Sequence, residues 1–167
     1  QRVARHIFSA EDAGADRILV TCSSIGRAVE AAMPLTGVPV LRVDQPMTDQ
    51  AVASGTRIGV IATLPTTLDP TADLVRRRAD VAGKSVEIHE HLCEGAFDAL
   101  MGGNATVHDE MVSRALLELA GNVDIILLAQ ASMARVAEQL DDDALSVPVL
   151  SSPVPAIEYL AGQFAQD

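Results

Sequence analysis

The sequence predicts an α/β protein in which parallel strands are covered by helices, and three observations support this. Strand-like and helix-like segments alternate along the whole chain of 167 residues. The strand-like runs "ILV" at 18–20, "RIGVIAT" at 57–63 and "VDIILLAQ" at 123–130 lack polar alternation, which is typical of strands buried on both faces. Two similar series of elements, one before about residue 56 and one after it, indicate two lobes.

The first series begins and ends with a helix. Gly14 suits the end of the first helix, and Ser23 or Ser24 is expected to cap the second. Pro46 suits the start of the third, because its missing N–H costs little there. The predicted elements are a helix at 2–14, a strand at 18–22, a helix at 24–33, a strand at 38–43 and a helix at 46–55.

The second series repeats this order after residue 56. Its first helix is expected to begin near Pro70, and the run at 85–92 alternates like an edge strand. The arginines at 76–78 are interpreted as a polar helix face. The predicted elements are a strand at 57–63, the helix near Pro70, a strand at 85–92, a helix at 105–121, a strand at 123–130, a helix at 132–140, a strand at 147–152 and a helix at 155–164.

Composition and charge exclude several classes of partner. The formal charge is −11, so phosphate backbones and anionic membranes would repel the chain, and we expect neither nucleic acid nor a membrane as partner. Aromatic residues make up only 2%, which argues against surfaces that stack bases. No apolar run approaches the roughly 20 residues of a membrane span. The two cysteines, Cys22 and Cys93, form no disulfide framework, so we expect a cytoplasmic protein.

The stretch "ILVTCSSIG" at 18–26 is the first candidate for chemistry. Cys22 lies where a strand ends and a helix begins, the edge of open α/β sheets at which ligands bind. Free N–H groups at a helix start favour a thiolate and can hold a carboxylate together with Ser23 and Ser24. The alternative is that Cys22 is a small buried hydrophobic residue.

Two further strand-to-helix junctions carry polar residues. "ATLPTTLDPT" at 62–71 offers hydroxyl groups, and "LLAQASMAR" at 127–135 offers an amide and a hydroxyl. Both could bind an anion, although such residues also serve as simple caps. The residues concerned are Thr63, Thr66, Thr67, Gln130 and Ser132.

Three other features are interpreted without a role in chemistry. His89 and His91 share one face of a strand, but no third metal ligand is evident, so no metal site is predicted. Cys93 is interpreted as structural. No Gly-rich phosphate loop follows any strand, which argues against a nucleotide-binding domain.

Taken together, "VTCSSIG", "GVIATLPTTLDPT" and "LLAQASMAR" resemble the aspartate/glutamate/hydantoin racemase superfamily over essentially the whole chain. The resemblance implies two pseudo-symmetric lobes with the active site between them, and two cysteines as opposed acid and base, without metal or organic cofactor. The first cysteine of the family falls on Cys22, followed by the small polar Ser23 and Ser24. The second falls on Gln130, in the triplet Ala129, Gln130, Ala131, and glutamine cannot exchange a proton near neutral pH.

The resemblance also implies an organisation for the chain. We expect a first lobe at 1–56, a second at 57–150, and a segment at 151–167 that packs back on the first lobe. The family's first strand and its loop are expected to lie before Gln1, since the chain begins in a helical pattern. A homodimer is expected, because dimers are common in the family.

Several functions remain open at this point. The leading hypothesis is a racemase or isomerase acting at the carbon next to a carboxylate, with Cys22 as acid, base or nucleophile. With a single thiol, decarboxylation of a malonate-type acid or isomerisation of an unsaturated diacid by thiolate attack are alternatives. A non-catalytic carboxylate-binding protein is the alternative from another class.

Overall fold

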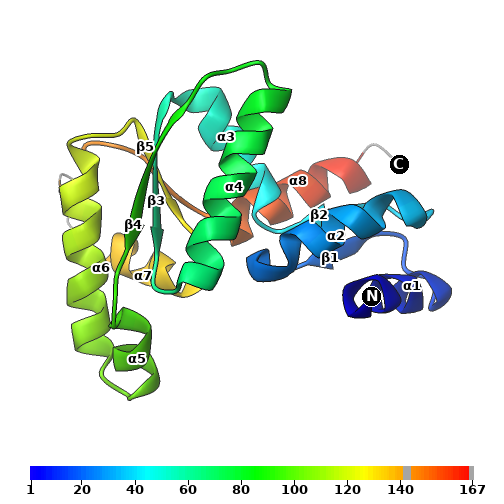
Figure 1. Ribbon diagram of the computed structural model, residues 1–167, viewed down its shortest axis with the longest axis horizontal. Helices are drawn as coiled ribbons and strands as arrows, with labels where there is room; N and C mark the ends of the chain where they lie inside the picture. The colour runs from blue at the N-terminus through cyan, green and yellow to red at the C-terminus, as the bar shows by residue number, and fades with distance from the viewer. Residues whose placement is uncertain (141–143, 166–167) are drawn as a thin grey trace.

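The short apolar runs of the sequence form the strands of two parallel sheets (Figure 1). The computed structural model describes residues 1–140 and 144–165. Within that part of the chain, the smaller sheet pairs β1 (Ile18–Val20) with β2 (Val40–Arg42). The larger sheet has the strand order β4-β3-β5-β6 and consists of β3 (Arg57–Ala62), β4 (Glu87–Leu92), β5 (Ile125–Leu128) and β6 (Val149–Ser151). The predicted α/β class with parallel sheets flanked by helices is confirmed.

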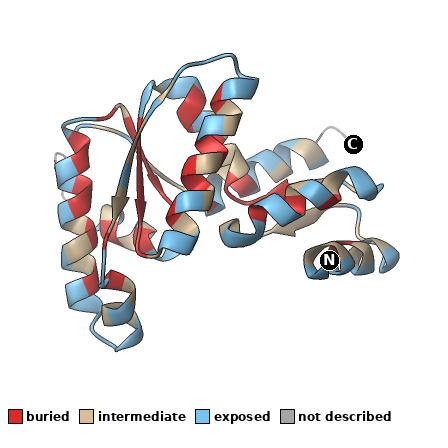
Figure 2. Ribbon diagram, in the orientation of Figure 1, coloured by how far each residue is buried: buried red, intermediate tan, exposed pale blue. Residues whose placement is uncertain are grey.

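The larger sheet is covered on both faces, which explains the continuous apolar runs of its central strands. On one face, Ile58 and Val60 pack with α3 (Gln45–Ser54) and α4 (Pro65–Val81). On the other face, Ile61 and Ile126 pack with α6 (Ala105–Ala120) and α7 (Ala134–Glu138). Figure 2 shows the buried residues concentrated on these facing surfaces. Successive side chains of β3 and β5 point to opposite faces of the sheet, as the pleat of a strand requires, and so they join the two cores in turn.

The smaller sheet has a smaller core. Ile7 of α1 (Arg2–Asp12) and Val29 of α2 (Gly26–Ala32) pack against Ile18 and Val20. The described residues also form three 3₁₀ turns: η1 (Ser23–Ile25), η2 (Met33–Leu35) and, after β5, η3 (Ala131–Met133). None of the helices in the described ranges is long and apolar enough to cross a membrane.

The last helix of each series packs near the sheet of the other series. α3 follows β2 but shares a core with the larger sheet, through Met47 and Val52. α8 (Pro153–Phe164) follows β6 but lines a hollow with Ile18 and Leu41 of the smaller sheet. The lobe boundaries at residues 56 and 150 stay predictions.

The structure corrects two expectations for the second series. α4 begins at Pro65, not near Pro70, and Pro70 lies inside the helix. Pro70 removes one backbone hydrogen bond there, but burial of Leu68 against the larger sheet keeps this turn helical. The short helix α5 (Ala96–Met101) was not predicted, because six residues are too few for a periodic pattern.

Candidate functional site

A pocket of about 420 Å³ lies where the carboxyl ends of the two sheets meet. The segments that follow β1, β2, β5 and β6 all contribute to its lining. Leu19, Val43 and Ile157 form apolar parts of the wall. Ligands of open α/β sheets bind at this edge, because the loops and helix starts there present free backbone N–H groups. This pocket is the candidate functional site.

Cys22 lies at this pocket directly after β1. Its backbone is extended, with φ −124° and ψ 109°, and it takes the N-cap position of η1, which leads into α2. The thiol is free and the residue is exposed. The prediction that Ser23 or Ser24 caps this helix is wrong, because the chain enters it through a 3₁₀ turn and no side chain makes a cap hydrogen bond. Both serines line the pocket instead.

The pocket is built from two copies of one structural unit. The order β1, η1, α2 in the first copy repeats as β5, η3, α7 in the second. Gln130 takes the N-cap position of η3 with φ −133° and ψ 131°, close to the angles of Cys22. Gln130 therefore occupies in the second copy the position that Cys22 occupies in the first.

The side chain of Gln130 is held in place by Thr63 at the end of β3. Its Oε1 accepts hydrogen bonds from the backbone N–H of Thr63 at 2.7 Å and from the Thr63 hydroxyl at 3.1 Å. Its Nε2 lies 2.8 Å from the same hydroxyl oxygen, to which it can donate. Because an amide has no titratable proton near neutral pH, the second copy offers hydrogen bonds but neither an acid nor a base.

Six of the nine residues predicted for the site line the pocket: Cys22, Ser23, Ser24, Thr67, Gln130 and Ala131. Thr67 lies on α4, and its hydroxyl donates to the Leu64 carbonyl at 3.0 Å. Thr63 is buried and supports Gln130 without lining the pocket. Thr66 and Ser132 are exposed and lie outside the lining.

The sequence interpretation missed Ser152, which lines the pocket at the start of α8. A signal for it exists: "VPVL" occurs at 38–41 and again at 147–150. Val43 and Ser152 stand at the same distance after these two runs, and both line the pocket.

The pocket lining in the described part of the chain contains no Asp, Glu, Lys, Arg or His. Cys22 is its only titratable side chain apart from weakly acidic hydroxyls. An anion bound here would meet backbone N–H groups, hydroxyls and the Gln130 amide, and no carboxylate in the lining would repel it.

The other candidate residues lie away from this pocket. Cys93 is buried, and burial, with a smaller contribution from the negative charge of Glu118, raises the pKa of its thiol to about 11. It therefore stays protonated and unreactive at neutral pH. His89 lies on the edge strand β4 with its Nε2 3.2 Å from a carboxylate oxygen of Glu87. Among residues 1–140 and 144–165, no three potential metal ligands gather at one place.

Comparisons with known proteins agree with this architecture. The chain resembles a glutamate racemase from Bacillus anthracis, with 20% identity and a TM-score of 0.70 over 98% of this chain and 64% of that one. For an allantoin racemase from Klebsiella pneumoniae the identity is 20% and the TM-score 0.71, over 98% of this chain and 65% of that one. For an aspartate racemase homologue from Pyrococcus horikoshii the values are 16% and 0.72, over 98% and 73%.

The chain spans just under two-thirds of the length of the first two proteins. These likenesses show the shared fold. The family model described as Asp/Glu/Hydantoin racemase matches residues 1–160, nearly the whole sequence. The chain therefore belongs to the Asp/Glu/hydantoin racemase family.

Proposed function

We propose that this chain is an isomerase of the racemase type, acting without cofactor at the carbon next to a carboxylate of a small acid or amino acid. Cys22 is the proposed acid and base, or nucleophile. The observation that carries the proposal is the position of Cys22, the only thiol lining a pocket where the carboxyl ends of both sheets meet. Membership of the racemase family supports the reaction type.

The proposed chemistry begins with binding of the substrate carboxylate. Hydroxyl groups of Ser23 and Ser24, with N–H groups at the start of η1, would donate hydrogen bonds to it. The thiolate of Cys22 then takes a proton from the neighbouring carbon, and the electron pair left behind moves into the carboxylate as an enediolate. Donors already in place would stabilise that charge. A water molecule on the opposite face of the carbon then gives it a proton, which inverts the centre, and the hydroxide left behind takes the proton back from the Cys22 thiol.

A second candidate function is decarboxylation of a malonate-type acid, and the fixed Gln130 amide favours it. Racemisation needs a proton donor on the face of the carbon opposite Cys22, and Gln130 cannot supply one. In decarboxylation, the bond to one carboxylate breaks, CO₂ leaves, and the electron pair forms an enediolate. The Cys22 thiol then protonates the carbon from one face, and water restores the thiol.

We also propose a small carboxylate as the ligand in either case, and a homodimer as the state in solution. Exposed apolar side chains on α8, Val154 and Ile157 among them, support the dimer, because apolar surface left uncovered favours association. Light scattering of the purified protein tests it, and a monomer mass would refute it.

The first experiment is alkylation of Cys22 by iodoacetamide near neutral pH, with and without a panel of small mono- and dicarboxylates. Cys22→Ser gives the blank, and Cys93→Ser is the matched control for the other thiol. Labelling that is faster than in the unfolded chain, and that one class of acid blocks, supports a catalytic thiol and identifies the ligand class. Labelling at the unfolded rate with no protection by any acid contradicts it.

The second experiment separates the two reactions with the acid that protects best. In D₂O, exchange of the hydrogen next to the carboxylate, followed by NMR, supports isomerase chemistry. Release of CO₂ supports decarboxylation. Protection without either reaction would leave a carboxylate-binding protein.

A further inference from the structure

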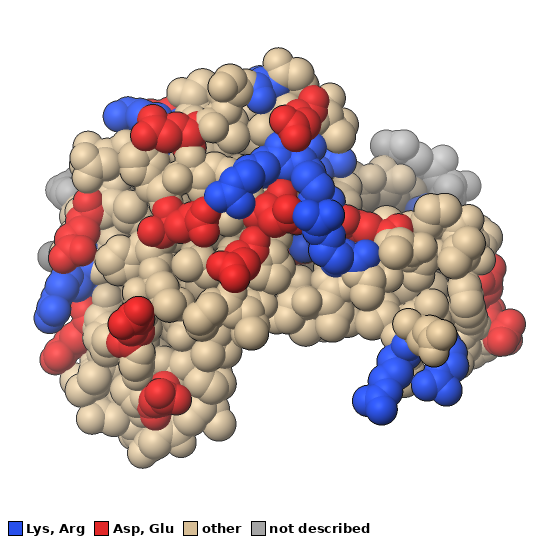
Figure 3. Space-filling view, in the orientation of Figure 1, with Lys and Arg blue, Asp and Glu red and all other residues tan. Residues whose placement is uncertain are grey.

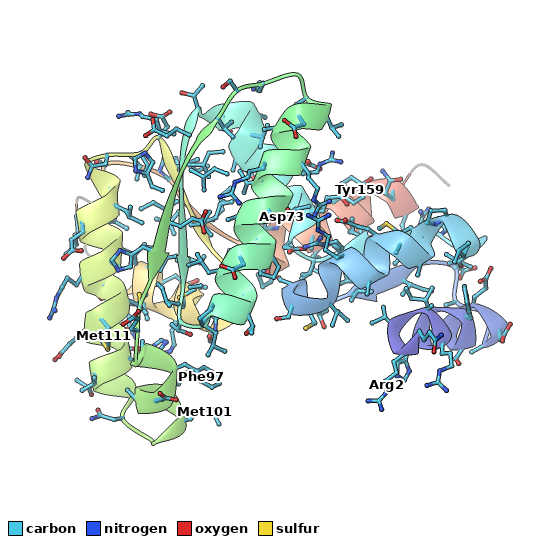
Figure 4. The ribbon with its side chains drawn as sticks, viewed as in Figure 1. Arg2, Asp73, Phe97, Met101, Met111 and Tyr159 are labelled. Carbon is cyan, nitrogen blue, oxygen red and sulfur yellow. The ribbon has the colours of Figure 1, made fainter. Side chains whose placement is uncertain are left out.

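Beside the pocket, six charged side chains form one connected cluster, which we call the charge cluster. Three are basic and three acidic, so the charge cluster is neutral. Its members are Arg27 and Glu30 of α2, Arg42 of β2, Asp44 before α3, and Asp73 and Arg77 of α4. Figure 3 shows basic and acidic groups intermixed in the middle of the molecule, and Figure 4 places Asp73 on the side of α4 near α2.

Arg42 is the buried centre of the charge cluster, with 2% of its surface exposed. Its Nε and one terminal nitrogen donate to the two carboxylate oxygens of Asp44 at 2.9 and 2.6 Å. The other terminal nitrogen donates to Glu30 at 2.6 Å. Buried ion pairs of this kind are often replaceable by apolar residues without loss of stability. What the bidentate pair supplies is a fixed position for the guanidinium plane.

The guanidinium of Arg42 lies directly against Gly26, the first residue of α2. A Cβ built on Gly26 would lie 2.1 Å from Cζ of Arg42 and 2.4 Å from both terminal nitrogens. The guanidinium therefore fills the space that any side chain at position 26 would need. Because Cys22 to Ile25 immediately precede Gly26, the turn that presents the thiol rests on this group.

Arg42 also fixes a second wall of the pocket. Val43, which lines the pocket, stands in the chain between Arg42 and Asp44. The hydrogen bonds that join the side chains of Arg42 and Asp44 therefore span Val43 and hold its backbone.

The charge cluster continues from Arg42 to α4, which carries the pocket residue Thr67. Glu30 binds Arg77 at 2.6 Å through its second carboxylate oxygen. Asp73 links Arg77 at 3.0 Å and Arg27 at 2.6 Å. The walls of the pocket that carry Cys22, Val43 and Thr67 are thereby joined by ion pairs outside the pocket.

We propose that Arg42 is a positioning residue for Cys22: through Gly26 and the charge cluster it holds the turn of the thiol at a fixed place against α4. The inference rests on Cys22 being the reactive group of the proposed function. Loosening of Arg42 would shift the turn η1 and the N–H groups that follow Cys22 in it, without removing any group from the pocket.

The test measures the alkylation rate of Cys22 by iodoacetamide in folded variants near neutral pH. Arg42→Lys keeps the charge but loses the planar bidentate contact. Glu30→Gln, at a less buried position, serves if Arg42→Lys does not fold. Arg57→Lys is the matched control, because Arg57 also binds one carboxylate, Asp124, through Nε and a terminal nitrogen, but at the opposite end of the larger sheet.

We expect Arg42→Lys and Glu30→Gln to slow alkylation by about two- to fivefold, the size of a helix-terminus effect on a charged group. Arg57→Lys should react at the wild-type rate even where its melting temperature falls. Equal rates in Arg42→Lys and wild type would overturn the positioning role. The absolute rate of the wild type against the unfolded chain tests the proposed function separately, so the two failures are distinguishable.

Discussion

The contact between Gly26 and Arg42 makes a quantitative prediction for Gly26→Ala. Gly26 has helical angles, φ −52° and ψ −44°, so alanine is sterically acceptable to the backbone and would gain about 1 kcal/mol of helix propensity. The new methyl group would, however, stand 2.1 Å from Cζ of Arg42, which must move by roughly 1 Å or more. Overpacking costs about 3 kcal/mol at the upper end of its usual range. The upper end applies here because hydrogen bonds to Glu30 and Asp44 hold the guanidinium in place.

The expected net loss for Gly26→Ala is about 2 kcal/mol of unfolding free energy. For a domain of this size that corresponds to a melting temperature lower by about 4–8 °C. Urea unfolding and thermal melts measure both quantities. Gly162→Ala in α8 is the matched control, because nothing lies within 4 Å of its Cβ position, and it should be neutral or stabilising. A Gly26→Ala protein as stable as Gly162→Ala would refute the reasoning.

Three further predictions follow from other contacts. Gln130→Cys places a thiol at the position equivalent to Cys22. It should create or raise hydrogen exchange of a bound acid, measured by NMR, and its racemisation, measured by chiral chromatography. Unchanged rates would count against a pocket built from two equivalent units. Asp124→Asn should have a lower melting temperature than the wild type at neutral pH. Hydrogen bonds from the backbone and side chain of Arg57 lower the Asp124 pKa. The ionised carboxylate therefore stabilises the folded protein above the ordinary carboxyl pKa, and this stabilisation is lost as the pH falls below it. Melts across pH should show the gap closing in acid, whereas a constant gap would contradict this. Because the Cys93 pKa is about 11, a thiol reagent at mildly alkaline pH should label one cysteine in the native chain and two after unfolding; two in the native chain would contradict its burial.

The strands and the place of Cys22 could be predicted from the sequence because both depend on local signals. β3 and β5 are buried on both faces, and this appears directly as unbroken apolar runs. Gln130 follows such a run, whereas Cys22 follows β1, whose residues are only half-buried, contrary to the expectation of burial on both faces. Both residues come just after an apolar run and precede a helical pattern, so their place at the sheet edge required no knowledge of distant contacts.

The side chains that reach the pocket could not all be predicted, because this depends on where each helix begins. With α4 starting at Pro65, Thr67 faces the pocket and Thr66 faces solvent. Both Pro65 and Pro70 are acceptable helix starts locally, and packing of Leu68 on the larger sheet decides between them.

Most of the charge cluster was also beyond sequence reasoning, since three of its five ion pairs join positions 12, 46 and 47 residues apart. The arginines at 76–78 look like a polar helix face, but each binds an acid of another element: Arg76 binds Glu90, Arg77 binds Glu30 and Arg78 binds Asp49. Alternating charge along one helix predicts solvation, and only the fold shows which carboxylates come near.

The packing of α8, the last helix of the second series, near the smaller sheet has a consequence for biosynthesis. β2, the second strand of the smaller sheet, ends at Arg42, and α8 beside this sheet spans residues 153–164, which are made more than a hundred residues later. During translation the first sheet must therefore wait, with part of its apolar surface uncovered, until nearly all of the described chain has left the ribosome. Such nascent chains are candidates for chaperone binding. A ribosome stalled before α8 should hold a protease-sensitive first sheet, and one stalled well after it should not.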